Sequence, residues 1–282
     1  MWAGTARKGR GCASAKSSME VLMFTSGKSL STCLLLLVCG LMFSSVLHAQ
    51  SWESETPLGE RLRIRLATGW GLYGMDNINK HYIDGFAKEA GILDDNIDGG
   101  PSIYGEVSYF LTPRISTGFG VLYLRSFSEK KSWENVLVFP EGETYAMRWE
   151  RSLTTTAMAP QVTVRYHFPL GDLDLFSGVG IAWCWGKSIL KSDERIRDLG
   201  ISESSEYRYT AQGLGLLGSV GMSHDLTERW AIGTEIGYRH FVTGDLENPS
   251  GNPWIVEYGG RGHKMNLDFS GAFLLVSLSV RL

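Results

Sequence analysis

Long segments in which apolar and polar residues alternate one by one constrain this chain more than any other feature. Successive residues of a β-strand point to opposite sides, so such alternation predicts a strand with two different faces. In the segment 61–72 the mainly apolar face carries Leu62, Ile64, Leu66, Trp70 and Leu72. The opposite face carries Arg61, Arg63, Arg65, Ala67, Gly69 and Gly71.

Seven further segments show the same pattern, and all of them are long. They span residues 102–111, 115–127, 152–168, 173–190, 207–224, 229–241 and 264–282. A tilted strand needs about 9–11 residues to cross a bilayer, whereas strands of soluble proteins usually have about 5–6. The pattern therefore predicts membrane-spanning strands.

The connections between these segments alternate in length. Those at 111–114, 169–172 and 225–228 are tight turns, and those at 75–101, 128–151, 191–206 and 242–263 are long and polar. Short periplasmic turns and long extracellular loops are typical of outer-membrane barrels. Unpaired strand edges are too costly in hydrocarbon, so the sheet must close. We predict an all-β fold, an eight-stranded antiparallel up-and-down transmembrane β-barrel with both termini on the periplasmic side.

The N-terminal region reads as an export signal. A largely apolar run, residues 30–47, follows Lys28 and ends at Leu47-His48-Ala49, which suits cleavage by a signal peptidase. The alternative is a membrane-anchoring helix. We expect a leader over residues 1–49, with Met1, Met19 or Met23 as the start, and a barrel domain over residues 50–282.

Loss of the leader changes both charge and cysteine content. The chain has 27 Lys and Arg against 30 Asp and Glu; the leader holds five basic residues and one acidic one, which leaves 22 against 29. An acidic exported chain is a poor nucleic-acid binder. Cys184 is the one cysteine that remains, so the sequence predicts neither an intramolecular disulfide nor a cysteine metal site. No cofactor is expected.

The inward face of the predicted barrel carries charged residues among glycines and alanines. They are Arg63, Arg65, Glu106, Gln161, Arg165, Glu235, Arg239 and Arg281. The interior of such a barrel is just wide enough for side chains to fill, and buried charges need partners. We predict a lumen plugged by an ionic network, in which cations outnumber anions, so that Gln161, Tyr104, backbone carbonyls or trapped water share the load. The alternative is a gated path for small ions.

Aromatic residues cluster near the ends of the outward stripes. They are Trp70, Tyr109, Tyr166, Phe168, Trp183, Trp185, Trp230 and Tyr238. We interpret them as interfacial girdles, with a sugar- or lipid-binding platform as the alternative. In the first long loop Ile78, Tyr82, Phe86 and Ala90 recur every four residues, which predicts a short amphipathic helix that packs on the barrel mouth.

Two short motifs invite chemical hypotheses. The stretch around His240 resembles the histidine motif of barrel lipid A deacylases, but the position two residues on is Val242, Thr243 falls on the opposite face, and Asp245 falls in the loop. A hydrolase needs a nucleophile within reach of its base, so an interfacial histidine is favoured. Residues 94–99 match the start of a calcium loop, but its twelfth position is Gly105 instead of glutamate, which favours an ordinary acidic turn.

The patterns FLTPRISTGFGVLYLRSF (110–127), FSGVGIAW (176–183) and HDLTERWAIGTEIGYRHF (224–241) resemble the eight-stranded family of outer membrane proteins A and X. The resemblance covers about residues 61–282 and implies a location in the bacterial outer membrane. It also implies outer-membrane lipids, including lipopolysaccharide, and the barrel assembly machinery as partners. The chain ends in Leu282, whereas members of this family often end in an aromatic residue.

These observations favour a non-enzymatic protein with a structural or surface-interaction role. Its extracellular loops would contact an external ligand or a host surface, and its lumen would be closed. A narrow porin-like channel for small solutes is the first alternative, and a lipid A-modifying enzyme is the second.

Overall fold

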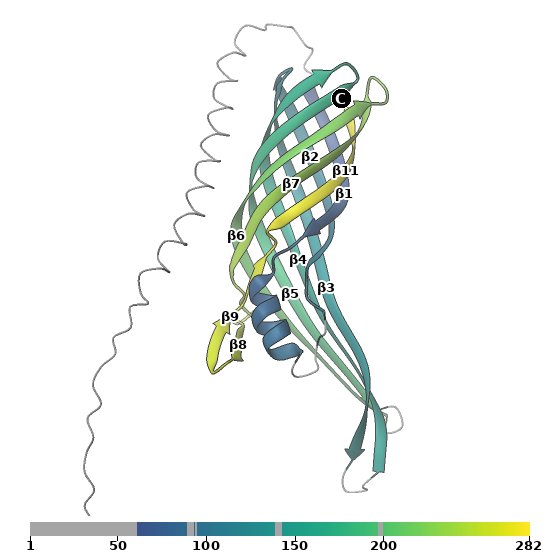
Figure 1. Ribbon diagram of the computed structural model, residues 1–282, viewed down its shortest axis with the longest axis vertical. Coiled ribbons are helices and arrows are strands. Elements are labelled where there is room, and N and C mark those ends of the chain that lie inside the picture. Colours follow the sequence, from purple (N-terminus) through teal and green to yellow (C-terminus); the bar gives the residue numbers. More distant parts are fainter. Residues whose placement is uncertain (1–60, 89–92, 94, 139–142, 197–199) are drawn as a thin grey trace, which may run out of the picture. The chain divides into compact units, whose positions relative to one another are not determined.

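The computed structural model (Figure 1) describes residues 61–88, 93, 95–138, 143–196 and 200–282, without the side chains of 132–138, 143–146 and 258. The predicted leader, residues 1–49, and the predicted start of the barrel domain at residue 50 lie outside the described residues. In the described part of the chain, no helix combines the length and apolar character that a membrane span requires.

Eight strands form one closed antiparallel ring, which confirms the predicted fold class. In ring order they are β1 (Leu62–Leu72), β2 (Gly99–Thr112), β3 (Ile115–Val138), β4 (Glu143–Leu170), β5 (Leu173–Ile196), β6 (Ile201–Asp225), β7 (Trp230–Asp245) and β11 (Gly271–Arg281). The ring closes because β1 pairs with β11 and β6 pairs with β7. We call the end that holds the short turns the turn end, and the opposite end the hairpin end.

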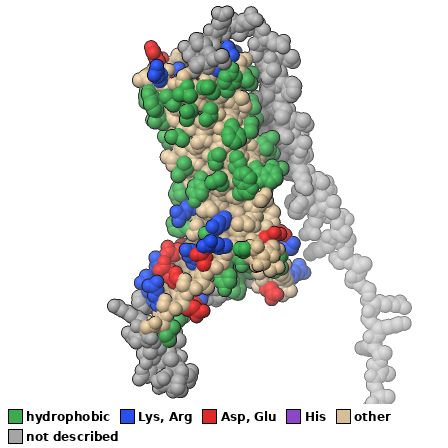
Figure 2. Space-filling model, turned by 180° about the vertical axis from the view of Figure 1, so that it is seen from behind, with side chains coloured by type: hydrophobic (Ala, Val, Ile, Leu, Met, Phe, Trp, Pro, Cys, Tyr) green, Lys and Arg blue, Asp and Glu red, His purple; other side chains and the backbone are tan. Residues whose placement is uncertain are grey.

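Apolar side chains cover the outside of the barrel, and mostly small and polar side chains line the inside near the turn end. Leu66 is 65% exposed, whereas the preceding Arg65 is 7% exposed. Figure 2 shows hydrophobic side chains over the body of the barrel and charged ones gathered toward the hairpin end. An apolar outer surface is stable in hydrocarbon and not in water, so this part of the barrel spans the membrane.

The predicted aromatic residues lie in two groups on the outer face. Tyr166 and Phe168 lie near the turn end, and their rings contact each other at 4.6 Å between centroids. At the other edge of the apolar belt, Trp183 and Trp185 of β5 are each more than two-fifths exposed, at 43% and 45%. These are the positions that interfacial girdles require.

Two of the four predicted long loops are instead continuations of the barrel wall. β3 and β4 stay paired as far as Val138 and Glu143, and β5 and β6 as far as Ile196 and Ile201. The expectation of loops at 128–151 and 191–206 was therefore wrong. Beyond the membrane a strand has water on its faces, so its residues are polar and resemble those of a loop.

The predicted last strand, 264–282, is broken near its start. Asn266–Asp268 forms a separate strand, β10, which pairs with β7, and the barrel strand β11 begins only at Gly271. Gly271 has a φ of 153°, and a Cβ atom there would lie 2.2 Å from the carbonyl oxygen of Leu72. Only glycine fits this close approach, so the chain changes direction here.

A helix and a hairpin cover the hairpin end. The helix, η3 (Ile78–Ala87), is a π-helix that ends where the Lys88 amide bonds to the carbonyl of Ile83 at 2.8 Å. Ile78 and Tyr82 are buried as predicted, Phe86 is 43% exposed, and Ala90 lies outside the described residues. The hairpin consists of β8 (Ile255–Tyr258) and β9 (Arg261–Lys264), joined by a tight glycine turn with positive φ angles.

Candidate functional site

A buried ionic cluster lies in the turn-end half of the lumen. We use this name for Arg65, Glu106, Arg165 and Glu235. Glu106 accepts hydrogen bonds from Arg165 Nη2 at 2.9 Å and Thr163 Oγ1 at 3.0 Å, and also from Arg165 Nη1 and the Tyr104 hydroxyl. Three donor side chains, one from β2 and two from β4, therefore share one carboxylate.

The second pair of the ionic cluster joins Arg65 to Glu235, and both side chains are under a tenth exposed, at 8% and 3%. The guanidinium of Arg65 also lies over the rings of Tyr104 and Phe176, at 5.8 and 5.7 Å. Taking charges out of water is costly unless each is paired and hydrogen-bonded. The cluster pairs each charge with an opposite one and links strands β1, β2, β4 and β7 across the lumen.

The other predicted lumen residues lie outside this cluster. Arg63 and Arg281 lie at the turn end, where Arg63 contacts Asp174 at 3.8 Å and Arg281 Nη2 bonds to both oxygens of Asp225, at 2.7 and 2.6 Å. Sequence reasoning missed both aspartates because they stand beside turns. Asp174 already has the inner parity of the predicted segment 173–190, and the pattern of 207–224 extended by one step would have placed Asp225 on the inner face as well.

Arg239 and Gln161 lie nearer the hairpin end, on either side of a small cavity of 20 Å³ that Glu235 also lines. Arg239 is 1% exposed, donates from Nε to the Phe269 carbonyl at 3.0 Å, and lies between the rings of Tyr73 and Phe273. Among the described residues it forms no ion pair with a carboxylate. Aromatic faces and a backbone carbonyl stabilise its charge instead.

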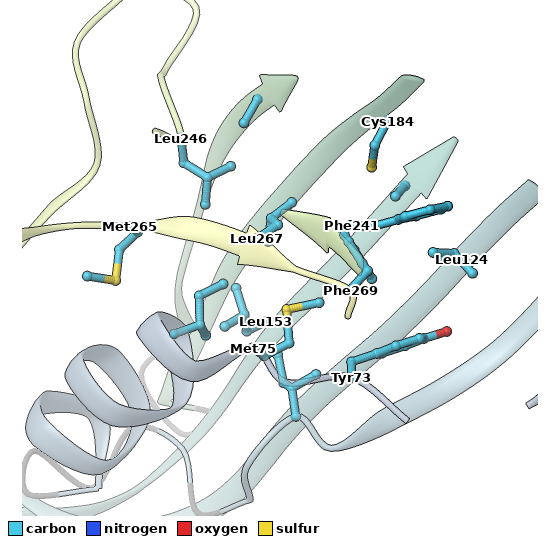
Figure 3. Close-up of a cluster of buried hydrophobic side chains, with 14 of the residues drawn as sticks. Tyr73, Met75, Leu124, Leu153, Cys184, Phe241, Leu246, Met265, Leu267 and Phe269 are labelled. Atoms are coloured by element: carbon cyan, nitrogen blue, oxygen red, sulfur yellow. The ribbon is translucent and has the colours of Figure 1, made fainter. Parts of the chain in front are cut away.

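An apolar plug closes the hairpin-end half of the lumen. Figure 3 shows side chains from the helix region, the barrel wall and the segment around β10 pointing toward one another. The plug consists of Met75, Leu124, Leu153, Phe241, Leu246, Met265, Leu267 and Phe269, each 0% exposed. Sequence reasoning missed it, although inward-facing Leu124, Leu153 and Phe241 departed from the polar inner stripe.

A groove lies at this hairpin end, between helix η3, the β8 strand and the extended strands β4 to β6. Its volume is 380 Å³. Trp254 stacks on Tyr209 at 4.7 Å between centroids and contacts Tyr82 edge-on at 5.0 Å. Burial raises the pKa of the Tyr82 and Tyr209 hydroxyls, so these rings stay neutral at physiological pH.

Exposed apolar side chains and paired charges form the rim of this groove. Phe86, Tyr207 and Ile255 are 43%, 54% and 51% exposed. Arg151 bonds to Glu194 at 3.1 Å, and Lys191 lies 3.2 Å from Glu206. The groove therefore offers an apolar aromatic floor with ionic groups at its edge.

The two chemical motifs from the sequence behave differently in the structure. His240 is exposed on the outer face, and its Nδ1 lies 3.1 Å from the Ser270 hydroxyl, which comes from outside the predicted motif. Ser270 Oγ also accepts the Phe241 amide at 3.1 Å. Thr243 faces the lumen, and Asp245 contacts Lys264 at 2.7 Å instead of the histidine.

In the motif at 94–99, Asp94 lies outside the described residues. The side chain of Asn96 contacts Lys88 at 3.1 Å, and Gly105 lies in the middle of β2, where it pairs with Leu66. Among the described residues, no group of three or more His, Cys, Asp or Glu side chains could hold a metal ion.

A closed ring of eight strands with an apolar outer belt and a filled lumen defines a small transmembrane β-barrel. The sequence matches the outer membrane protein beta-barrel domain over residues 37–261, and the chain belongs to this family. It is therefore a protein of the bacterial outer membrane, as the resemblance to outer membrane proteins A and X implied. A comparison with curated proteins gives no match.

Solved outer-membrane structures are similar at low identity. Neisserial surface protein A is 12% identical with a TM-score of 0.36, and the match covers 78% of this chain and 97% of that one. A major outer membrane protein from Thermus thermophilus is 12% identical with a TM-score of 0.35, and the match covers 78% of this chain and 99% of that one. The outer membrane protease OmpT from Escherichia coli is 12% identical with a TM-score of 0.29, and the match covers 82% of this chain and 99% of that one.

Proposed function

We propose that this protein is a surface-binding protein of the outer membrane, with a closed lumen and a ligand-binding groove at its hairpin end. The observation that carries the proposal is the aromatic groove of 380 Å³ formed by η3, β8 and the extended strands. Outer-membrane lipids surround its apolar belt, and its ligand comes from outside the cell.

The filled lumen supports binding over transport. The cavities beside the ionic cluster and beside Arg239 measure 30 and 20 Å³, which is room for about one or two water molecules each. The apolar plug lies between them and the hairpin end. A solute would have to displace buried charge pairs and a packed apolar core, and both steps are costly.

The groove supports a ligand with an aromatic or acyl group and an ionic group. Its floor holds neutral rings of Tyr82, Tyr209 and Trp254, which offer apolar contact area at low cost in side-chain entropy. Arg151 and Lys191 at the rim already have carboxylate partners, so they guide a charged group without leaving a buried ion unpaired.

The orientation follows from the length of the strands. The extended parts of β3 to β6 carry charged residues on faces that hydrocarbon would not tolerate. The turn end has only short connections, as periplasmic ends of these barrels do. The hairpin end with its groove then faces the cell exterior.

Titration of anilinonaphthalene sulfonate against the protein in lipid nanodiscs tests this role. We expect saturable binding at one site, with energy transfer from Trp254. The double substitution Phe86→Ala and Tyr207→Ala should weaken binding by about tenfold or more, which is about 1.4 kcal/mol. Ile201→Ala is the matched control, because Ile201 is also exposed, at 52%, but does not line the groove. Equal affinity of all variants would contradict the proposal.

A further inference from the structure

Three side chains at the turn end form a continuous hydrogen-bonded chain. The Ser116 hydroxyl lies 2.8 Å from Nε2 of His167, and Nδ1 of His167 lies 2.8 Å from Oδ2 of Asp174. An ionised aspartate only accepts, so Nδ1 carries the imidazole proton and Nε2 accepts from the serine. This is the order of atoms that activates a serine nucleophile.

The topology brings these residues together from three consecutive strands. Ser116 is the second residue of β3, His167 lies near the end of β4, and Asp174 is the second residue of β5. All three face inward by the period-two pattern. Arg63 lies 3.8 Å from Asp174 and places a positive charge beside its carboxylate. The orientation of the imidazole is therefore fixed on both sides.

The hydrogen-bonded residues Ser116, His167 and Asp174 lie next to an open vestibule. The vestibule has a volume of 930 Å³ and includes Asp174, Arg63 and Phe110 in its walls. Arg63 and Phe110 also line the inner cavity of 30 Å³ that holds Ser116 and His167. The Phe110 ring packs on His167 at 4.8 Å, with the Arg63 guanidinium 5.0 Å from its centroid. Phe110 thus separates the serine from the vestibule.

The same inner cavity holds unused hydrogen-bond donors. Nε of Arg63 and Nε of Arg165 are buried and have no hydrogen-bond partner among the described residues. Both arginines line the cavity beside Ser116. Cationic donors placed beside a nucleophile stabilise the negative oxygen that forms when a carbonyl is attacked.

The second serine–histidine pair of the barrel lacks these features. His240 bonds to Ser270 through Nδ1, and among the described residues no ion pair joins its other nitrogen to a carboxylate. The Ser270 oxygen is also engaged by the Phe241 amide. The pair at Ser116 is therefore the better-formed nucleophile.

We propose that Ser116, His167 and Asp174 form a hydrolytic centre for short-chain carboxylic esters that enter from the turn end. Ser116 Oγ attacks the ester carbon while its proton moves to His167 Nε2. The carbon–oxygen ester bond breaks, and the proton passes from Nε2 to the leaving alcohol. Water then attacks the acyl group with the same proton route, which releases the acid and restores the serine. Asp174 is a positioning residue.

This centre goes beyond the binding role proposed for the groove and is independent of it. It also departs from the non-enzymatic role that the sequence favours. The alternative is a purely structural chain that joins three strands, and such a chain would not make Ser116 reactive.

Covalent labelling with diisopropyl fluorophosphate separates the two. We expect one phosphoryl adduct, mapped by mass spectrometry to Ser116, in the folded protein in nanodiscs. Ser116→Ala should abolish it, and His167→Gln should slow it by about a hundredfold or more. Ser223→Ala is the matched control, because Ser223 is a buried serine in the same cavity without a histidine partner; it should label like the parent.

The variant Phe110→Ala covers the case in which the Phe110 ring blocks the access of the reagent to Ser116. Removal of the ring should open the inner cavity to the vestibule and speed the labelling of Ser116. No adduct on Ser116 in either the parent or Phe110→Ala would overturn the proposal.

The role of Asp174 is tested with 4-nitrophenyl acetate. Asp174→Asn should lower kcat by about a hundredfold with KM within about twofold. The shift of the folded band on a denaturing gel shows that each variant is folded. Equal hydrolysis by the parent, Ser116→Ala and Asp174→Asn would also contradict the centre, and titration of the groove in the same variants shows whether the binding role stands on its own.

Discussion

Glu106 of β2 and Arg165 of β4 face each other across β3, with Arg165 Nη2 2.9 Å from a Glu106 carboxylate oxygen. Both side chains are almost fully buried, at 1% and 6% exposed. The pair ties together strands that are not neighbours in the ring. It is the centre of the ionic cluster, which therefore holds the barrel wall from within.

Loss of one partner should cost more than the pair contributes. Glu106→Ala leaves Arg165 buried without its carboxylate, at a cost of about 3–5 kcal/mol. Glu235→Ala should act similarly through Arg65. We expect both variants to unfold at lower temperature in the heat-shift assay on a denaturing gel. Glu129→Ala, which removes an exposed partner of Lys131, should change little, and an unchanged Glu106→Ala protein would argue against the cluster's stabilising role.

The outer face of β11 should reject charge. Val276 is 47% exposed, next to the buried Ser277, and lies in the middle of the strand. Val276→Lys should destabilise the barrel by about 2–4 kcal/mol in denaturant titrations in lipid, because its charge would lie in hydrocarbon. Val276→Leu should be close to neutral. Equal stability of both would mean that this face does not contact lipid.

The unmodified protein should conduct little or no current in planar bilayers. The lumen holds buried ion pairs toward the turn end and packed apolar side chains toward the hairpin end. Single-channel recording at both polarities measures this directly, with the empty bilayer as control. Large and steady currents would refute the closed lumen and favour a channel for small solutes.

Orientation can be read from single cysteines in intact cells. Cys184 is buried at 0% exposure, so it should not react. A membrane-impermeant maleimide should label Ser250→Cys, in the exposed turn between β7 and β8, and spare Pro113→Cys and Glu228→Cys at the turn end. All three should react once the cells are broken. The reverse pattern would place the hairpin end in the periplasm.

Acid should loosen the contact between η3 and the β8–β9 hairpin. His81 stacks on His263 at 3.9 Å between ring centroids. Burial, followed by the charges of His263 and Lys80, lowers the pKa of His81 below its ordinary 6.5. The folded contact therefore binds protons less readily, so its stability is present above pH 6.5 and falls as the pH drops below that value.

Hydrogen exchange of the β9 amides between pH 7 and 5, corrected for intrinsic rates, measures this loosening. His81→Phe keeps an aromatic contact without a titrating group and should remove the pH dependence. The contact would be of another kind if the variant and the parent opened alike with falling pH.

The sequence predicted the barrel well because its signal is local. Alternation such as Arg65 beside Leu66 is enforced residue by residue by lipid outside and a narrow lumen inside. That rule placed Glu106 and Glu235 on the inner face before any contact was known. The alternation predicts which face of the strand a side chain occupies, but it does not predict which side chain it contacts. The pairing of Arg65 with Glu235 rather than with Glu106 therefore needed the three-dimensional structure.

The parts that sequence reasoning missed lie where that rule stops. Beyond the membrane, paired strands such as 128–138 carry the same polar residues as loops. Met265, Leu267 and Phe269 lie on the inner parity of the predicted strand 264–282, but the break before Gly271 carries them into the lumen, and the alternation does not mark that break. Ser116, His167 and Asp174 are separated by up to 58 positions in the chain, and only the register of β3, β4 and β5 brings them together.

Strand β4 is long enough to extend far beyond the membrane, although the barrel has a small circumference. From the lipid-facing Met158 to its far end at Glu143, the strand continues for roughly 50 Å at the usual rise per residue. Because β3 and β5 pair with it along much of that distance, this part of the sheet forms a stiff projection. A partner held at its tip would stay clear of the carbohydrate that coats the bilayer. Shortening this projection by equal numbers of paired residues in β3 and β4 should then lower capture of the partner by cells. The loss should be larger for cells with long surface polysaccharide than for cells without it.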